Sequence, residues 1–298
     1  MDNILQRYPG LVCPACCISD LGLNHDKIFC RACDTQYELL DDKYPILITP
    51  NGEICHEEIS IQDQAAIRYE TGRYQNTWAR AYHDWWTELM ISHVDVTGRI
   101  LDNGCGAGKL FECLPKSDII GLDLSTEMIR VAGTKNRRVL VSDSHQLPFS
   151  DGSFDTIFAR SLLHHMTDFH KGILEMARVL RTGGEIVSVD TNKSMLSTLP
   201  RRVFGGRERF SNEHKNFERN ELVQVFSKYL KVEHVSFFGY VAYPILGFPD
   251  IADIFRFFPF KKISYKILTK IDSLLECLPW IRTQGWAILI KARKTQTK

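Results

Sequence analysis

A short apolar run that ends on an acid and leads directly into closely spaced glycines constrains this chain more than any other segment. The run covers residues 99–102 and ends on Asp102, and the glycines are Gly104, Gly106 and Gly108. Glycine tolerates positive φ and lets a ligand approach the backbone, so the pattern predicts a strand that opens into a binding loop. Dinucleotide-binding loops have a different glycine spacing. Asp102 would also repel a pyrophosphate, although it can accept an ammonium group.

Two more apolar runs lead to acids. Residues 119–123 end on Asp123, at about the 20-residue offset that suits a carboxylate accepting hydrogen bonds from ribose hydroxyls. Ser125 then suits the N-cap of a following helix. Residues 138–141 lead to Asp143, where a carboxylate can accept a hydrogen bond from an adenine amino group.

The chain then alternates short apolar runs with a helical pattern. We expect a strand over 153–161, a helix over about 168–180 and then the run 178–187, which contains a Gly-Gly pair. This alternation predicts βαβ units and therefore an α/β fold with a parallel sheet.

Together these motifs, over residues 97–190, resemble the class I S-adenosylmethionine-dependent methyltransferases. Within that class they are most similar to the broad type 11 group that includes ubiquinone and menaquinone biosynthesis enzymes. The resemblance implies a Rossmann-like class I methyltransferase sheet and S-adenosylmethionine as cofactor. It implies that Asp102 and the three glycines hold the methionine end, that Asp123 binds the ribose, and that Asp143 with Ser144 meets the adenine.

The same resemblance implies that Arg160 and Ser161 line the floor below the sulfonium. Asn103 replaces the Val, Ile or Leu that is commoner in this loop. The cofactor residues that we expect on this basis are Asp102, Gly104, Gly106, Gly108, Asp123, Leu124, Asp143, Ser144, Arg160 and Tyr69.

A helical stretch over 65–93 is rich in Tyr and Trp. Aromatic residues at helical spacing usually pack in a core, and we expect that of at least half of them. In similar enzymes a helix at this place folds over the cofactor. Tyr69 and Tyr74 are therefore candidates for cofactor contact.

Two Cys-x-x-Cys pairs near the N-terminus predict a metal site. Their members are Cys13, Cys16, Cys30 and Cys33. Four thiolates suit a tetrahedral Zn²⁺ site, and such a site is structural because no coordination position stays open. Cys17 lies beside the first pair and is expected to be a bystander. The first fifty residues resemble the zinc ribbon of the tRNA-methyltransferase activator subunit and the ribbons fused ahead of some ribosomal RNA methyltransferases.

His164 and His165 follow the expected strand over 153–161, at the carboxyl edge of the sheet where substrates bind. Either imidazole is a candidate general base for an acceptor that must lose a proton. A purely structural role is the alternative, because a His pair is frequent at this place in similar enzymes with different acceptors.

Residues 239–284 separate the last two expected strands, and we call them the inserted cap. A connection of this length usually has a function or its own structure. The segment combines many aromatic residues with Lys261, Lys262, Lys266 and Lys270. This composition suits a large apolar or anionic acceptor, or peripheral contact with a membrane. The alternative is a helical pair that only packs on the sheet.

A second basic group consists of Arg201, Arg202, Arg207 and Arg209, around a Gly-Gly pair. We expect a solvated loop, with a mobile lid or an anion-binding segment as alternatives.

Composition places few limits on the function. Apolar residues make up 44% of the chain, enough for a sizeable core, and a net charge of +1 gives no global attraction to nucleic acid. The N-terminus lacks the features of a signal peptide, and no apolar run is long enough for a transmembrane segment. We therefore expect a cytoplasmic protein with reduced cysteines.

We expect three parts: a zinc-ribbon-like domain at 1–50, a helical linker and cofactor cover at 51–95, and a methyltransferase domain at 96–298 that carries the inserted cap before its last strand. The leading functional hypothesis is methyl transfer to a small-molecule or lipid-like acceptor. The alternative is an RNA methyltransferase, which the ribbon and the basic groups favour and the apolar cap disfavours. A third hypothesis is a non-catalytic domain that binds cofactor or a partner.

Overall fold

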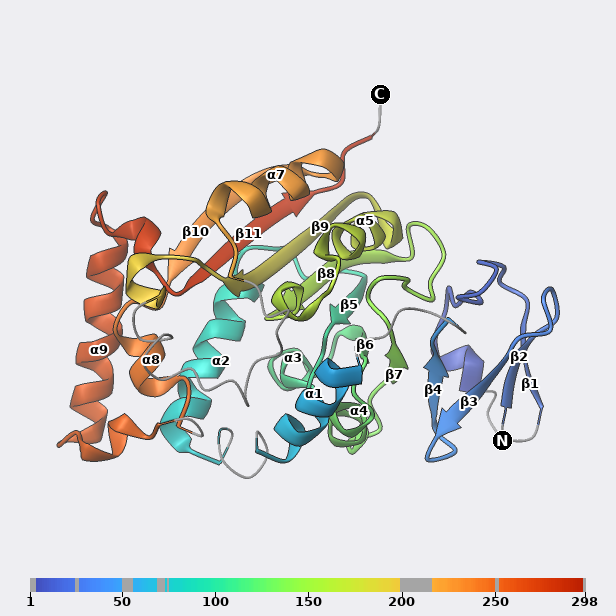
Figure 1. Cartoon of the computed structure of the whole chain (residues 1–298), viewed down its shortest axis with the longest axis horizontal. Coiled ribbons are helices and arrows are strands. Elements are labelled where there is room, and N and C mark those ends of the chain that lie inside the picture. Colours follow the sequence, from blue (N-terminus) through green and yellow to red (C-terminus); the bar gives the residue numbers. More distant parts are fainter. Residues whose placement is uncertain are drawn as a thin grey trace.

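The computed structural model describes residues 4–24, 27–49, 56–68, 73, 75–198, 216–249 and 252–296. Within these residues, eleven strands form one continuous sheet in the order β1-β2-β3-β4-β7-β6-β5-β8-β9-β11-β10. Figure 1 shows the helices on both faces of its central part and the N-terminal strands at one end. The α/β fold class expected from the sequence is confirmed.

Five parallel strands form the central part of the sheet. They are β5 (Arg99–Asn103), β6 (Asp118–Asp123), β7 (Val139–Ser142), β8 (Phe154–Arg160) and β9 (Leu180–Thr191). Most of their side chains are buried, as expected for parallel strands covered on both faces. β11 (Ala287–Arg293) runs antiparallel to β9, and β10 (Lys231–Phe238) pairs antiparallel with β11 at the edge.

One helix leads into β5, and the other helices connect the strands that follow. These helices are α2 (Thr77–Ile91), α3 (Lys109–Cys113), α4 (Thr126–Gly133), η3 (Leu163–His165), α5 (Phe169–Val179) and α7 (Arg219–Tyr229). Ser125 caps α4 as predicted, since its hydroxyl accepts a hydrogen bond from Met128 N at 3.1 Å. The start of α4 therefore lies directly after Asp123, at the carboxyl edge of the sheet.

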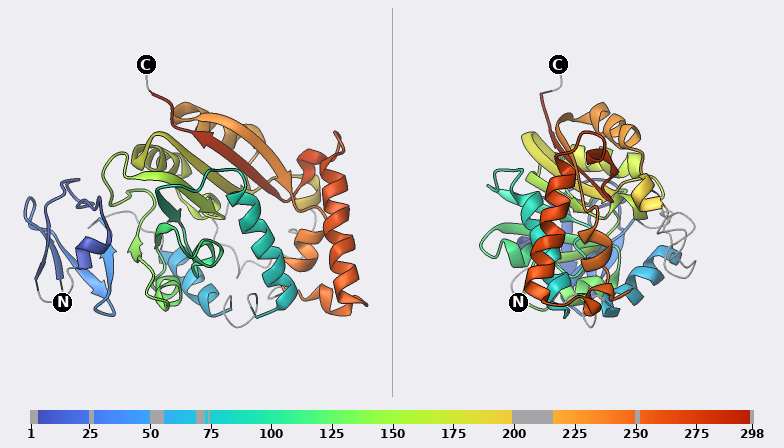
Figure 2. Two further views of the ribbon diagram at one scale, coloured as in Figure 1. Left: turned by 180° about the vertical axis from the view of Figure 1, so that it is seen from behind. Right: turned by 90° about the vertical axis from the view of Figure 1, so that its left-hand side faces the viewer.

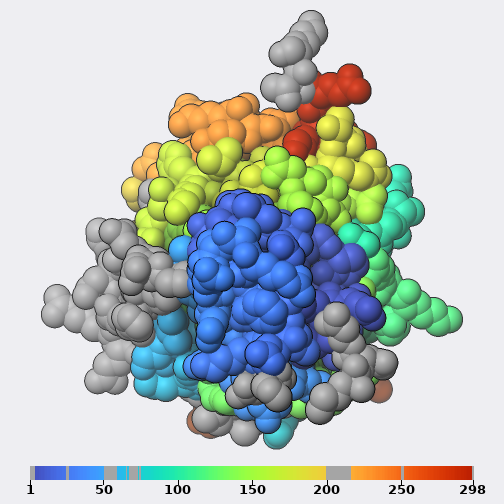
Figure 3. Space-filling model, turned by 90° about the vertical axis from the view of Figure 1, so that its right-hand side faces the viewer, coloured from blue at the N-terminus to red at the C-terminus, as the bar shows by residue number. Residues whose placement is uncertain are grey.

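The N-terminal ribbon comprises η1 (Ile4–Arg7), β1 (Leu21–Asn24), β2 (Lys27–Cys30), β3 (Gln36–Leu40) and β4 (Tyr44–Leu47). Its four strands form an antiparallel meander. β4 then pairs in parallel with β7, so that Ile46 lies opposite Val141 and Leu47 opposite Ser142. Figure 3 looks onto this end of the molecule, with the ribbon in front.

The ribbon and the central sheet share one hydrophobic core. Tyr8, Ile28, Tyr37 and Leu47 belong to the same buried cluster as the β5 residue Leu101. Buried hydrogen bonds reinforce this junction: Tyr8 Oη donates to Val139 O and Tyr44 Oη donates to Gly133 O, both at 2.8 Å. The ribbon is therefore anchored to the central sheet by packing as well as by strand pairing.

The inserted cap lies between β10 and β11, as the sequence predicted. It contains α8 (Ala242–Leu246), η5 (Ile254–Phe257), α9 (Lys261–Glu276) and η6 (Arg282–Gln284). Its inner side joins α2 and the sheet in a second core, where Tyr243, Phe255 and Leu268 meet Tyr82 and Trp86. Figure 2 shows α9 across the end of the molecule opposite the ribbon.

α1 (His56–Arg68) follows the ribbon and contacts α4. Across the described ranges, every helix is too short or too polar to traverse a bilayer. The arginine group at 201–209, Tyr69 and Tyr74 lie outside the described residues. The division into domains at 1–50, 51–95 and 96–298 stays a prediction.

The shared core makes a testable prediction about the ribbon junction. Tyr8→Phe removes the hydroxyl that donates to the buried Val139 O, so we expect the free energy of unfolding to fall by about 1–2 kcal/mol in urea titrations. Tyr229→Phe is the matched control, because that ring is 38% exposed, and its stability should stay unchanged. Equal stability of the Tyr8 variant and the parent chain would contradict a ribbon docked on β7.

Candidate cofactor site

The carboxyl ends of β5, β6, β7 and β8 bring most of the predicted cofactor residues to one edge of the sheet. Asp102 lies near the end of β5, Asp123 ends β6, Asp143 follows β7, and Arg160 ends β8. Because these strands are parallel neighbours, their ends meet, as in other open α/β sheets that bind ligands at this edge.

The glycine loop after β5 has the backbone that its sequence predicted. Gly104, Gly106 and Gly108 all have positive φ, at 73°, 49° and 79°. A side chain at Gly104 would also collide with Leu162, whose Cδ1 lies 2.9 Å from the ideal Cβ position. A Cβ at Gly106 would instead meet only Met128 Sδ at 4.0 Å, so it would project into open space. The loop forms a cradle that a side chain at Gly106 would fill.

Asp102 is a buried acid with little electrostatic compensation. It is 4% exposed, and among the described residues nothing donates a hydrogen bond to its side chain. The pKa of Asp102 is raised to about 7, mainly by burial and to a smaller extent by Asp123, while Arg160 and Arg137 act in the opposite direction. Such a carboxylate suits a cationic partner, and an ammonium group fits it better than a phosphate.

Asp123 holds the glycine loop in place. Its Oδ2 accepts a hydrogen bond from Gly106 N at 2.9 Å, and its Oδ1 accepts one from Ser125 N at 3.0 Å. The surrounding protein desolvates this carboxylate and raises its pKa, although the backbone donors and the nearby His165 work in the opposite direction. Each carboxylate oxygen has a further lone pair, so the group can also accept from hydroxyls of a ligand.

The turn after β7 is fixed by the polar residues that were predicted to meet adenine. Asp143 Oδ1 accepts from His145 N at 2.9 Å and lies 2.7 Å from His145 Nδ1. Burial works to raise the pKa of Asp143, but the hydrogen bonds from His145 outweigh it and leave the pKa lowered. Ser144 Oγ donates to Asn103 Oδ1 at 2.7 Å, which links this turn to the glycine loop. The unusual Asn103 therefore has a partner, although its Nδ2 is buried without one.

Arg160 joins the strand ends to α2. Its guanidinium donates to Thr87 Oγ1 at 2.9 Å and lies 5.3 Å from the centre of the Trp86 ring. Trp86 and Thr87 of α2 thus hold the arginine whose positive charge acts to lower the pKa of Asp102.

The two histidines of η3 have different surroundings. His164 is buried, and its Nδ1 bonds to a carboxylate oxygen of Asp190. Asp190 also accepts from Leu163 N at 2.7 Å and Thr191 N at 2.8 Å, which fixes its orientation. His165 is half-buried, and its ring centre lies 3.9 Å from that of His164.

α1 supplies polar residues to this region that sequence reasoning missed. Asp63 accepts a hydrogen bond from Ser125 Oγ, and Gln62 Nε2 lies 3.4 Å from His165 Nδ1. Side chains of α1 therefore contact both the start of α4 and η3. Asp190 was missed as well, since it lies at the end of an apolar strand with no motif of its own. The sequence signal that could have found it is an acid at the end of the run 183–190.

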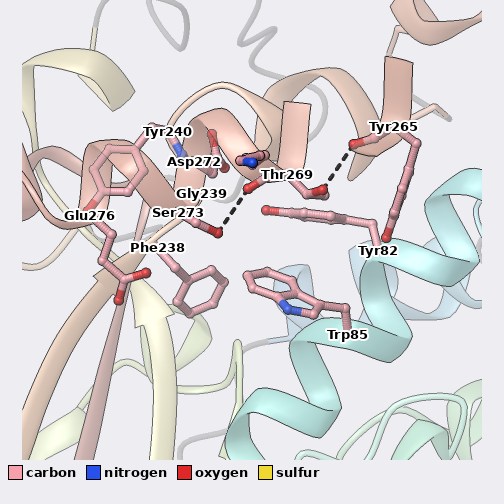
Figure 4. A pocket seen from close by; sticks show the side chains of 11 residues that line it. Tyr82, Trp85, Phe238, Gly239, Tyr240, Tyr265, Thr269, Asp272, Ser273 and Glu276 are labelled. Atoms are coloured by element: carbon pink, nitrogen blue, oxygen red, sulfur yellow. Dashed lines mark hydrogen bonds between the residues drawn. The ribbon is translucent and has the colours of Figure 1, made fainter. Parts of the chain in front are cut away.

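A separate pocket of about 310 Å³ lies between α2, the end of β10 and α9. Figure 4 shows aromatic side chains on its walls, with Tyr82 and Trp85 from α2 and Tyr265 from α9. Asp272 lies in its wall, and its carboxylate accepts from three backbone N–H groups, those of Tyr240, Val241 and Ala242. No lining residue belongs to the strand-end group, so this pocket is distinct from the cradle.

The four predicted metal ligands come together in the ribbon. The Sγ atoms of Cys13, Cys16, Cys30 and Cys33 all lie within 4.8 Å of one another. Cys13 and Cys33 are 3.6 Å apart, and so are Cys16 and Cys30. A tetrahedral zinc site with Zn–S bonds of about 2.3 Å places its sulfurs about 3.8 Å apart, so the thiol geometry fits this ion.

Comparisons with known proteins agree with the central fold. Residues 101–204 match the family model of the methyltransferase domain, so this part of the chain is similar to that family. The uncharacterized methyltransferase YcgJ of Bacillus subtilis is 38% identical over 101 residues, which are 31% of this chain and 40% of that protein. A tRNA (carboxymethyluridine(34)-5-O)-methyltransferase of Arabidopsis thaliana is 35% identical over 91 residues, 30% of this chain and 22% of that protein.

The demethylmenaquinone methyltransferase of Lactococcus lactis is 34% identical over 128 residues, 38% of this chain and 51% of that protein. The chain thus spans less than two thirds of the length of each of these relatives. In structure, a SAM-dependent methyltransferase of Thermotoga maritima superposes with a TM-score of 0.56 at 18% identity, over 79% of this chain and 99% of that one.

A chain of the complex that contains the Haloferax volcanii Trm112 methyltransferase activator superposes with the same TM-score of 0.56, at 22% identity, over 80% of this chain and 98% of that one. At these identities the likeness concerns the fold, which is that of the class I S-adenosylmethionine-dependent methyltransferases.

The raised pKa of Asp102 makes stability depend on pH. Between the ordinary carboxyl pKa and about 7, the folded chain keeps a proton on Asp102 that the unfolded chain releases. The stability due to this proton is present at low pH and lost as the pH rises through about 7. We expect Asp102→Asn to raise the free energy of unfolding of the ligand-free chain by roughly 1–4 kcal/mol at about pH 8.5, and by less at about pH 5.5.

Urea titrations at the two pH values measure this difference. Asp95→Asn serves as the control, because that carboxylate is exposed, and it should change stability little at either pH. If the gain in the free energy of unfolding from Asp102→Asn does not grow with pH, Asp102 is not a buried carboxylate with a raised pKa.

Proposed function

We propose that the chain is an S-adenosylmethionine-dependent methyltransferase that acts on a small-molecule or lipid-like acceptor. The observation that carries the proposal is the group of strand-end acids around the glycine loop. Asp102 is buried beside a cradle that opens at Gly106, and Asp123 braces that cradle through Gly106 N at 2.9 Å. Together they suit a ligand with an ammonium group at one end and a ribose beyond it.

In this proposal, Asp102 receives the ammonium group while Gly104, Gly106 and Gly108 let the methionine end approach the backbone. Asp123 and Leu124 lie along the ribose. Asp143 and Ser144 meet the adenine from the turn that His145 stiffens. Arg160 lies on the floor of the site, and Tyr69 remains a candidate contact.

When bound, S-adenosylmethionine supplies a methyl group on a positively charged sulfur. The chain's residues have to orient the acceptor and exclude water. In this proposal α1 helps to exclude water, since Asp63 and Gln62 hold it against Ser125 and His165.

We propose His164 as the general base, with His165 as the other candidate. Asp190 is a positioning residue in this scheme. Its carboxylate holds His164 Nδ1, which fixes the ring orientation and stabilises the protonated imidazole. This role requires an acceptor that loses a proton, such as a hydroxyl or an amine.

The inserted cap favours an apolar acceptor, because its packing brings aromatic residues over α2 and the sheet end. RNA is the second candidate acceptor. One observation favours it: the ribbon contacts the turn that carries Asp143, since Thr49 Oγ1 donates to Gln146 Oε1 at 2.8 Å. A partner held by the ribbon would therefore lie near the proposed adenine end of the site.

We further propose a structural Zn²⁺ ion held by Cys13, Cys16, Cys30 and Cys33. Their spacing within 4.8 Å supports it, and four thiolates leave no open position for catalysis. Tyr37 Oη lies 3.0 Å from Cys13 Sγ and would support that ligand from behind. Thiolate ligands suit a reducing compartment, and we propose that the protein is cytoplasmic.

Transfer of radiolabelled methyl groups into fractionated cell extract tests the function. We expect label in the lipid or small-molecule pool and none with Asp123→Ala, which removes the brace of the glycine loop. His164→Asn should lower transfer by about 10²-fold or more while cofactor affinity stays unchanged, as expected for a lost base. Label in RNA instead would favour the second candidate, and label in no pool would contradict the proposal.

Metal analysis tests the zinc site without reference to activity. The purified chain should carry one zinc ion, and Cys16→Ser should lose it and lower the melting temperature, because structural zinc contributes directly to folding. Cys17→Ser is the matched control, since Cys17 is exposed and lies outside the group of four, and it should keep the metal. A well-folded, metal-free chain would contradict the site.

A further inference from the structure

The outer side of the inserted cap carries a continuous row of exposed apolar side chains. Within α9, Ile263, Ile267, Ile271 and Leu274 recur at helical spacing, so they share one side of the helix. The row continues at both ends, and we call it the apolar stripe: Phe260, Ile263, Ile267, Ile271, Leu274 and Leu278, each between 37% and 79% exposed.

The opposite side of α9 is already fixed to the protein. Leu268 is buried in the core with α2, and Asp272 is buried where it accepts from the backbone at the start of α8. Tyr265 packs against Trp78 with ring centres 5.6 Å apart. The helix therefore cannot turn to bury the apolar stripe without breaking this packing. Figure 2 shows α9 lying across its end of the molecule.

Cations border the apolar stripe. Lys262, Lys266 and Lys270 are exposed on α9. The helix has two acids: Asp272 is buried, and Glu276 is exposed but lies on the side away from the apolar stripe. Arg256 is exposed as well and lies over the Phe257 ring at 4.5 Å. The surface thus combines apolar side chains with positive charge at its rim.

Aromatic side chains mark both ends of this surface. Phe257 and Phe260 precede α9, and Trp280 follows it with 91% of its surface exposed. Phe260 adopts φ 45°, a conformation that bulky residues rarely take. Exposed aromatic residues beside an amphipathic helix are typical of segments that enter the boundary between lipid headgroups and acyl chains.

We propose that α9 and its flanking aromatic residues dock the protein on a lipid bilayer that contains anionic headgroups. Acyl chains would cover the apolar stripe, and headgroup phosphates or carboxylates would pair with Lys262, Lys266 and Lys270. α9 has 16 residues and a length of about 24 Å, so it lies in the plane of the membrane and does not cross it. This docking does not depend on the proposed reaction.

The charge pattern favours lipid over a second copy of this chain. Pairing of two such helices about a twofold axis would bring the lysines that border one stripe against those that border the other, which opposes association. An anionic bilayer suits both parts of the surface. Its acyl chains can cover the apolar stripe, and its negative headgroups lie where the bordering lysines would be.

Vesicle sedimentation with the full chain tests the proposal. We expect binding to vesicles of phosphatidylcholine with phosphatidylserine, weaker binding to phosphatidylcholine alone, and loss of the difference at high salt. The double variant I263D/I267D should bind at least about tenfold more weakly. L174D is the matched control, because Leu174 is 44% exposed on α5 and lies outside the surface, and it should bind as the parent chain does.

Sedimentation velocity without lipid distinguishes the competing occupant. We expect a monomer whose size is unchanged by I263D/I267D. A dimer that this double variant dissociates would assign the surface to self-association and overturn the proposal. Equal vesicle binding by the double variant and the parent chain, or no binding to anionic vesicles, would overturn it as well.

Discussion

The hydrogen bond from Gly106 N to the Asp123 carboxylate is the contact on which the candidate site depends. It ties the loop after β5 to the end of β6, while Ser125 N binds the other oxygen and aligns α4. With the loop fixed at positive φ, the cradle stays open beside Asp102, whose buried carboxylate has its pKa raised to about 7. A shift of that loop would displace the cradle from beside this acid.

Much of this arrangement could be predicted from local sequence. Strand ends, glycines and Cys-x-x-Cys pairs impose geometry within a few residues, so Asp102, Asp123 and the four cysteines were found without a structure. Contacts that depend on tertiary packing were not. Asp190 lies 26 positions from His164 and reaches it through the pairing of β8 with β9. The meeting of Asp63 with Ser125 depends on where α1 docks, which no local pattern specifies.

The two additions to the central fold lie at opposite ends of one sheet. The ribbon continues it through β4 and β7 and shares its core, and the inserted cap closes the other end over α2. Each addition has one side committed to the sheet and one side facing outward. The ribbon presents a compact thiol cluster, and the cap presents apolar side chains bordered by lysines. We infer that the central sheet carries the proposed cofactor site, while the outward surfaces at its two ends determine which partner or membrane the protein contacts.

Calorimetric titration with S-adenosylmethionine and, separately, with NADH tests the central claim most directly. We expect saturable binding of S-adenosylmethionine that weakens as the pH falls below about 7, because protonation of Asp102 removes the charge that receives the ammonium group. We expect no saturable binding of NADH, whose pyrophosphate Asp102 repels. Saturable NADH binding without a response to S-adenosylmethionine would contradict the assignment of the strand-end acids to an ammonium-bearing cofactor.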